Sequence, residues 1–107
     1  MALLYKHEVP EKQFGEILQE TEKFNLERIK KYIKEPVTYL QLQNGLVMFI
    51  NGAAQILHVH FNPLATRTIW NAGLVDAAIY GDVLVLDLNE IDSSIHLVNQ
   101  EKGNKIA

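Results

Sequence analysis

Two runs of β-forming residues flank the dipeptide Asn44-Gly45, and this feature constrains the fold more than any other. Asn-Gly between such runs is the strongest short-range hairpin signal, because both residues accept the positive φ angles that a tight turn requires. We therefore expect one strand over residues 37–43 and an antiparallel partner over residues 46–50. The second run is apolar at nearly every position, so the chain is expected to fold around an antiparallel sheet.

Further segments with strand character extend this sheet. Residues 55–61 follow a second Asn-Gly, Asn51-Gly52, and supply the third strand of an antiparallel meander. Its two faces are expected to differ, one carrying Ile56, His58 and His60 and the other Leu57, Val59 and Phe61. Four more segments are predicted strands: residues 3–9, 75–80, 83–88 and, at an edge, 95–98.

Apolar residues at helical spacing predict two helices near the N-terminus. The first begins at Glu11 and continues through residue 21. The second begins after Asn25, a favourable N-cap, with Phe24 and Ile29 at the two positions of a hydrophobic staple. It ends at residues 35–36, because the residue before a proline is disfavoured in the α conformation.

A third, short helix is predicted over residues 63–72. Asn62-Pro63 is the preferred order of residues at a helix start, and Gly73 supplies the stop. With 107 residues the chain fits one small domain. We predict an α+β fold with N-terminal helices, an antiparallel β-meander and one short helix between strands, in which residues 99–107 form a frayed tail.

Composition and charge exclude several functions. The chain has no cysteine, which excludes disulfides, thiol catalysis and the usual structural zinc sites. Residues 35–98 hold six acidic residues against Arg67 alone, and such a surface cannot neutralise a phosphate backbone. No apolar run reaches the length of a membrane span. We therefore expect a cytoplasmic protein that binds neither nucleic acid nor membrane directly.

The run Asn62-Pro-Leu-Ala-Thr66 is followed, after a helix-length gap, by Ile79-Tyr-Gly-Asp-Val-Leu-Val85. This combination resembles a family of small phage and bacterial proteins known only as a domain of unknown function. The family is similar in element order, with a short helix, a strand hairpin, an N-x-x-A-T helix start and a closing G-D-V strand. The resemblance implies a phage or mobile-element setting and no catalytic residues. Small phage proteins often block host defences by binding a defence protein or sequestering a nucleotide signal.

The start of the third predicted helix is the main candidate binding site. Free N–H groups at a helix N-terminus suit an anion, and Arg67 is the only Lys or Arg in residues 35–100. Asn62, Thr66 and Arg67, with Trp70 one turn further on, therefore predict a site for a phosphate or carboxylate group. In the structural alternative, Asn62 only caps the helix, Thr66 faces the next strand, Arg67 pairs with an aspartate, and Trp70 lies in the core.

Residues with catalytic or metal-binding chemistry are sparse. His58 and His60 lie two apart on the predicted strand, so their imidazoles share a face, but two nitrogens are too few for a metal site. The acidic pairs Asp82 with Asp87 and Asp87 with Glu90 are typical of surface turns rather than acid–base catalysis. The sequence therefore predicts neither an enzyme nor a cofactor.

Three functional hypotheses follow. The leading one is a small binding protein that covers a host protein or sequesters a small, nucleotide-like anion, with an anti-defence role in a phage setting. The second is a structural or oligomerisation module in which residues 46–50 or 83–86 pair across a subunit boundary, since a homo-oligomer is expected. The third is a small metal-dependent hydrolase that uses His58 and His60.

Overall fold

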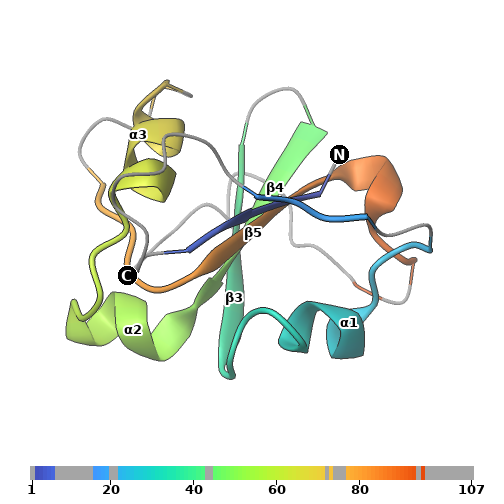
Figure 1. Cartoon of the computed structure of the whole chain (residues 1–107), viewed down its shortest axis with the longest axis horizontal. Coiled ribbons are helices and arrows are strands. Elements are labelled where there is room, and N and C mark those ends of the chain that lie inside the picture. The colour runs from blue at the N-terminus through green and yellow to red at the C-terminus, as the bar shows by residue number, and fades with distance from the viewer. Residues whose placement is uncertain are drawn as a thin grey trace.

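An antiparallel sheet forms the centre of the computed structural model, which describes residues 2–6, 16–19, 22–42, 45–71, 73, 77–93 and 95. Its strand order is β2-β1-β5-β4-β3, and every neighbouring pair is antiparallel (Figure 1). The strands are β1 (Leu3–Tyr5), β2 (Glu16–Ile17), β3 (Val37–Gln41), β4 (Leu46–Asn51) and β5 (Val83–Asp87). The α-helices are α1 (Leu26–Lys30), α2 (Gly52–Leu57) and α3 (Pro63–Asn71). The predicted α+β class is confirmed.

The predicted hairpin is formed by β3 and β4. Its register places Val37 opposite Asn51, and the amide nitrogen of Leu42 donates a hydrogen bond of 2.8 Å to the carbonyl oxygen of Leu46. Gly45 has a φ of +75°, a left-handed value that glycine adopts without the steric cost of a Cβ. The local turn chemistry is therefore sufficient to specify this part of the fold.

Strand β4 is buried on both faces. Val47 and Phe49 belong to a hydrophobic core that includes residues of α1, whereas Met48 and Ile50 belong to a second core that includes residues of α3. The two helices accordingly lie on opposite sides of the strands (Figure 1). Because each face of the strand meets a packed layer, a continuous apolar run replaces the usual alternation of apolar and polar residues.

Helix α1 begins as predicted. The side-chain oxygen of Asn25 accepts a hydrogen bond of 2.9 Å from the backbone N–H of Arg28, which satisfies one of the unpaired donors of the first turn. Phe24 and Ile29, the predicted staple residues, are both buried in the same core. The helix ends at Lys30, earlier than the predicted end at residues 35–36, and a cis peptide bond joins Glu35 to Pro36.

The prediction of a helix over residues 11–21 is wrong at Glu16–Ile17, which form β2. Leu3 of β1 lies opposite Ile17, and the amide nitrogen of Leu18 donates to the carbonyl oxygen of Ala2 at 3.0 Å. Helical spacing alone does not reveal that β1 requires a partner on its second edge, so a long-range pairing overrides the local pattern. Lys6, Leu18 and Gln19 are in neither a strand nor a helix, and the rest of both N-terminal predictions, residues 7–15, 20 and 21, lies outside the described residues.

The prediction of a strand over residues 55–61 is also wrong. Asn51 caps a helix instead of closing a hairpin, because its side chain accepts a hydrogen bond of 2.9 Å from the N–H of Ala54. Gln55 is buried and uses its side chain to bind the carbonyl oxygen of Ala78 at 2.7 Å and the N–H of Tyr80 at 3.1 Å. In the described part of the chain between β4 and β5 there are therefore two helices rather than the predicted one.

Helix α3 agrees with the prediction, and Gly73 ends it with a φ of +97° and a hydrogen bond of 3.0 Å to the carbonyl oxygen of Trp70. Residues 77–79 are not a strand, and Tyr80 forms only an isolated bridge with Phe61. Leu88 begins a short 3-10 helix, Leu88–Glu90, rather than extending β5. Ile95 is not in a strand, and residues 74–76 and 96–107 lie outside the described part of the chain.

The sheet order contradicts the proposed pairing of β4 or β5 across a subunit boundary. Strand β5 lies between β1 and β4, and β4 lies between β5 and β3. Both edges of both strands are already hydrogen bonded within the chain, so neither strand can recruit another copy by adding to the sheet.

Candidate functional site

Asn62, predicted to be part of an anion-binding site, is completely buried. Its Oδ1 accepts a hydrogen bond of 3.0 Å from the N–H of Ala65 at the start of α3. Its Nδ2 donates to the carbonyl oxygens of Tyr5 at 2.9 Å and Gly81 at 2.8 Å. These internal partners occupy both donors of the amide and one acceptor site, so Asn62 presents no group to an external ligand.

Thr66 is also buried and bonded within the fold. Its Oγ1 accepts a hydrogen bond of 2.9 Å from the N–H of Ile79 and donates to the carbonyl oxygen of the same residue at 3.4 Å. The backbone N–H of Thr66 itself donates to the carbonyl oxygen of Asn62. The start of α3 is therefore closed by the protein's own groups, and this favours the structural alternative for both residues.

Arg67 and Trp70, the other two predicted site residues, lie on the surface. Trp70 is 49% exposed, although its Nε1 donates a hydrogen bond of 2.7 Å to the carbonyl oxygen of Ala77. An indole with one satisfied polar group and an exposed ring is suited to apolar contact with a partner. The structure thus separates the four predicted residues into two that build the interior and two that face solvent.

A different surface emerges at the end of α2. All six residues from Ile56 to Phe61 are exposed, and we call them the 56–61 segment. Ile56 and Leu57 are each 68% exposed, Phe61 is 50% exposed and Val59 is 39% exposed. Four large apolar side chains are therefore exposed within six residues, and a concentration of exposed apolar surface is typical of an interaction site.

The backbone of the 56–61 segment is fixed in an uncommon conformation. His58 has φ and ψ of 56° and 46°, and His60 has a φ of 62°, left-handed values that are uncommon for residues with a side chain. The N–H of Val59 donates to the carbonyl oxygen of Ala54, and the carbonyl oxygen of His60 accepts from the N–H of Gly81 at 2.7 Å. These bonds anchor the backbone of the segment to α2 and to the loop before β5. The prediction that His58 and His60 share one face of a strand is therefore wrong.

Tyr80 adds an aromatic layer to this surface. The His58 ring stacks on the Tyr80 ring with centroids 5.0 Å apart, and Phe61 meets the same ring edge-on at 5.8 Å. Such pairs contribute about 0.5–1.5 kcal/mol each. The sequence pattern does not reveal this cluster, because Phe61 and Tyr80 are joined by an isolated bridge and not by two paired strands.

A cleft of about 500 Å³ adjoins the 56–61 segment. Lys34, which follows α1, and Ala53 and Leu57 of α2 are among the residues that line it. Its polar lining also includes Asn51, His60 and Asp82. Its volume falls within the range of a site for a small molecule or a single large side chain.

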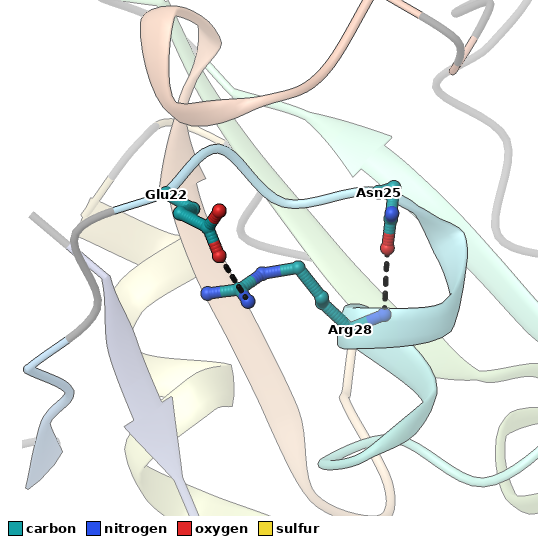
Figure 2. A network of polar contacts seen from close by, with 3 residues as sticks. All are labelled: Glu22, Asn25 and Arg28. Atoms are coloured by element: carbon teal, nitrogen blue, oxygen red, sulfur yellow. Dashed lines mark hydrogen bonds and ion pairs between the residues drawn. The ribbon is translucent and has the colours of Figure 1, made fainter.

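A second hollow, of about 420 Å³, lies beside the start of α1 and contains Glu22, Asn25 and Arg28. Figure 2 shows the Arg28 guanidinium directed toward Glu22, at 3.4 Å, and its backbone nitrogen capped by Asn25. The guanidinium also lies 5.4 Å from the centre of the Phe24 ring. The network joins the loop to the helix that it precedes, so these groups have a structural explanation.

Catalytic and metal-binding groups do not gather in the part of the chain that the structure describes. No cluster of three or more His, Asp or Glu residues suited to a metal ion occurs there. Of the predicted acidic pairs, Glu90 accepts a hydrogen bond of 2.8 Å from the backbone N–H of Asp87, a capping interaction. Among the described helices, none combines the length and apolar character needed to cross a bilayer.

Comparison of the chain with protein-family models, with curated proteins and with solved structures finds no match. The resemblance to the phage and bacterial family therefore stays a prediction.

Proposed function

We propose that this chain is a non-enzymatic binding protein that covers a partner protein with the 56–61 segment. One observation carries the proposal: six consecutive residues are exposed, and four of them are large and apolar. The surrounding hydrogen bonds fix this surface before any partner arrives, so binding requires little further ordering of the backbone. Exposed aliphatic and aromatic side chains next to a cleft are suited to a protein surface.

The buried start of α3 argues against the alternative ligand, a small nucleotide-like anion. Asn62 and Thr66 have their hydrogen-bonding groups directed into the protein, and the 56–61 segment carries no Lys or Arg to pair with a phosphate. An apolar surface instead favours a partner with its own apolar side chains. In the phage setting implied by the resemblance, we propose that this partner is a cytoplasmic host protein whose action is blocked when it is covered.

Site-specific photo-crosslinking tests this proposal. The photoreactive residue p-benzoylphenylalanine is placed at Ile56 in one variant and at Leu88 in another, and both are expressed in the candidate host. Leu88 is a matched control because it is also exposed, at 50%, but lies on the short 3-10 helix after β5. We expect one dominant crosslinked host protein from position 56 and not from position 88.

A charged variant supplies the second arm. Leu57→Asp places a carboxylate on the 56–61 segment and should abolish the crosslink from position 56, whereas Leu88→Asp should leave it unchanged. Equal crosslinking from both positions, or a crosslink that survives Leu57→Asp, would contradict the proposal. Circular dichroism of each variant distinguishes loss of binding from loss of folding.

A further inference from the structure

We propose that a second copy of this chain covers the 56–61 segment when no other partner is bound, forming a two-fold symmetric dimer. This self-association is separate from the capture of a host protein and does not depend on it. The occupant is inferred from three properties of the surface: its charge, its shape and its area.

The first property is the absence of fixed charge. No Asp, Glu, Lys or Arg occurs between Pro36 and Thr66. The 56–61 segment and the whole of α2 therefore carry no side chain with a fixed charge. In a two-fold interface the same patch meets itself, and residues near the axis face their own copies. Any fixed charge there would repel its counterpart. The 56–61 segment itself, whose only ionisable side chains are His58 and His60, satisfies this condition, whereas the charged surface of α1 does not. The adjoining cleft carries one charge of each sign, Lys34 and Asp82, so it adds no net charge of one sign to the interface.

The second property is the adjacency of a protruding side chain and a hollow. Ile56 projects from α2 with 68% of its surface exposed, and the next residue, Leu57, lines the cleft together with Ala53 and Val59. A two-fold axis beside α2 would direct the Ile56 side chain of each copy into the cleft of the other. A cleft of about 500 Å³ is large enough to receive it.

The third property is the area that such a dimer would bury. Complete burial of the exposed side chains of the segment would cover on the order of 500 Å² per copy, or about 1,000 Å² in total, which is in the size range of weak or transient interfaces. Because interfaces of this size are weak or transient, we expect a dimer with a Kd in the micromolar range, on the order of 10–100 µM, rather than a permanent one. A weak dimer protects the apolar surface at high concentration and still releases it to a tighter partner.

Sedimentation equilibrium tests the dimer. The wild-type chain is measured at neutral pH from about 5 to 500 µM, a range that brackets the expected Kd. We expect the average mass to rise from the 12.2 kDa of the monomer toward twice that value. Leu57→Glu should raise the Kd at least tenfold, whereas Leu88→Glu should leave it within a factor of two.

Two results would overturn the proposal. One is a wild-type mass that stays at the monomer value throughout the range, and the other is a dimer that Leu57→Glu leaves intact. If Leu57→Glu proves poorly folded, Ile56→Ala replaces it, because truncation of this exposed side chain removes the projection without introducing charge. Neither overturning result changes the expected crosslink to a host protein, so the two proposals fail separately.

Discussion

The side-chain nitrogen of Asn62 lies 2.9 Å from the carbonyl oxygen of Tyr5, 57 residues earlier in the chain. The same nitrogen binds the carbonyl oxygen of Gly81, and the side-chain oxygen caps α3 at Ala65. One buried amide therefore joins the end of β1, the start of α3 and the loop before β5. Asn62, which the sequence predicted to contact a ligand, instead connects three parts of the fold.

This arrangement predicts an unusual order of stability for two substitutions. Asn62→Ala should lower the free energy of unfolding by about 2–4 kcal/mol, because it removes a helix cap and leaves buried carbonyl groups without donors. Asn62→Asp should lower it further, since a carboxylate keeps the cap but faces the carbonyl oxygens of Tyr5 and Gly81 with negative charge. Urea denaturation followed by circular dichroism measures both. An Asp variant as stable as the wild type would contradict the assigned hydrogen bonds.

The sequence predicts those parts of the fold that depend on local chemistry. Asn44-Gly45 specifies the hairpin, Asn25 begins α1, and Asn62-Pro63 begins α3. The prediction fails where a distant segment decides the structure. At Ile17 the deciding partner is β1, and at Gln55 the helix is fixed by hydrogen bonds to Ala78 and Tyr80.

The candidate site was harder to predict than the fold. Alternating apolar residues in 55–61 are typical of a half-buried strand. The segment is instead the end of a helix followed by residues in the left-handed conformation. The exposure of Ile56 and Leu57 follows from the position of α2 relative to the sheet, which no local pattern encodes. In contrast, the burial of Asn62 and Thr66 agrees with the structural alternative that the sequence had already suggested.

The left-handed backbone at His58 gives a second prediction. His58→Val and His58→Gly both remove the stack on Tyr80, so they differ mainly in backbone preference. At a φ of 56°, the Cβ of valine causes a steric cost that glycine avoids. Glycine in turn loses more backbone entropy on folding, but this loss is smaller than the steric cost of valine. We expect the glycine variant to be more stable by about 1 kcal/mol, as measured by thermal unfolding.

Thr38 is the matched control for this comparison, because it is exposed in the extended strand β3. There the order should reverse, with Thr38→Val more stable than Thr38→Gly. If valine is preferred over glycine at both positions, the left-handed conformation of His58 is not maintained in solution.

The network at the start of α1 gives a third prediction (Figure 2). Asn25→Ala should cost about 1 kcal/mol of stability, because the N–H of Arg28 loses its capping oxygen. Glu22→Gln should change stability by less than about 0.5 kcal/mol, since its ion pair with Arg28 is long, at 3.4 Å, and Glu22 is exposed. Chemical denaturation of the two variants side by side checks the order. A larger loss for Glu22→Gln would show that the ion pair, rather than the cap, holds this helix.

The closed start of α3 gives the last prediction, which concerns ligands. Trp70 is the only tryptophan and its ring is half exposed, so its fluorescence reports directly on binding beside Arg67. We expect neither ATP nor inorganic phosphate, up to about 5 mM, to change the emission in a saturable way, because Asn62 already occupies the N–H groups of Ala65 and Thr66. A saturable change that disappears in Arg67→Ala but persists in Lys31→Ala, a control at another exposed cation, would instead establish an anion site at α3. That result would favour nucleotide sequestration over the covering of a partner protein.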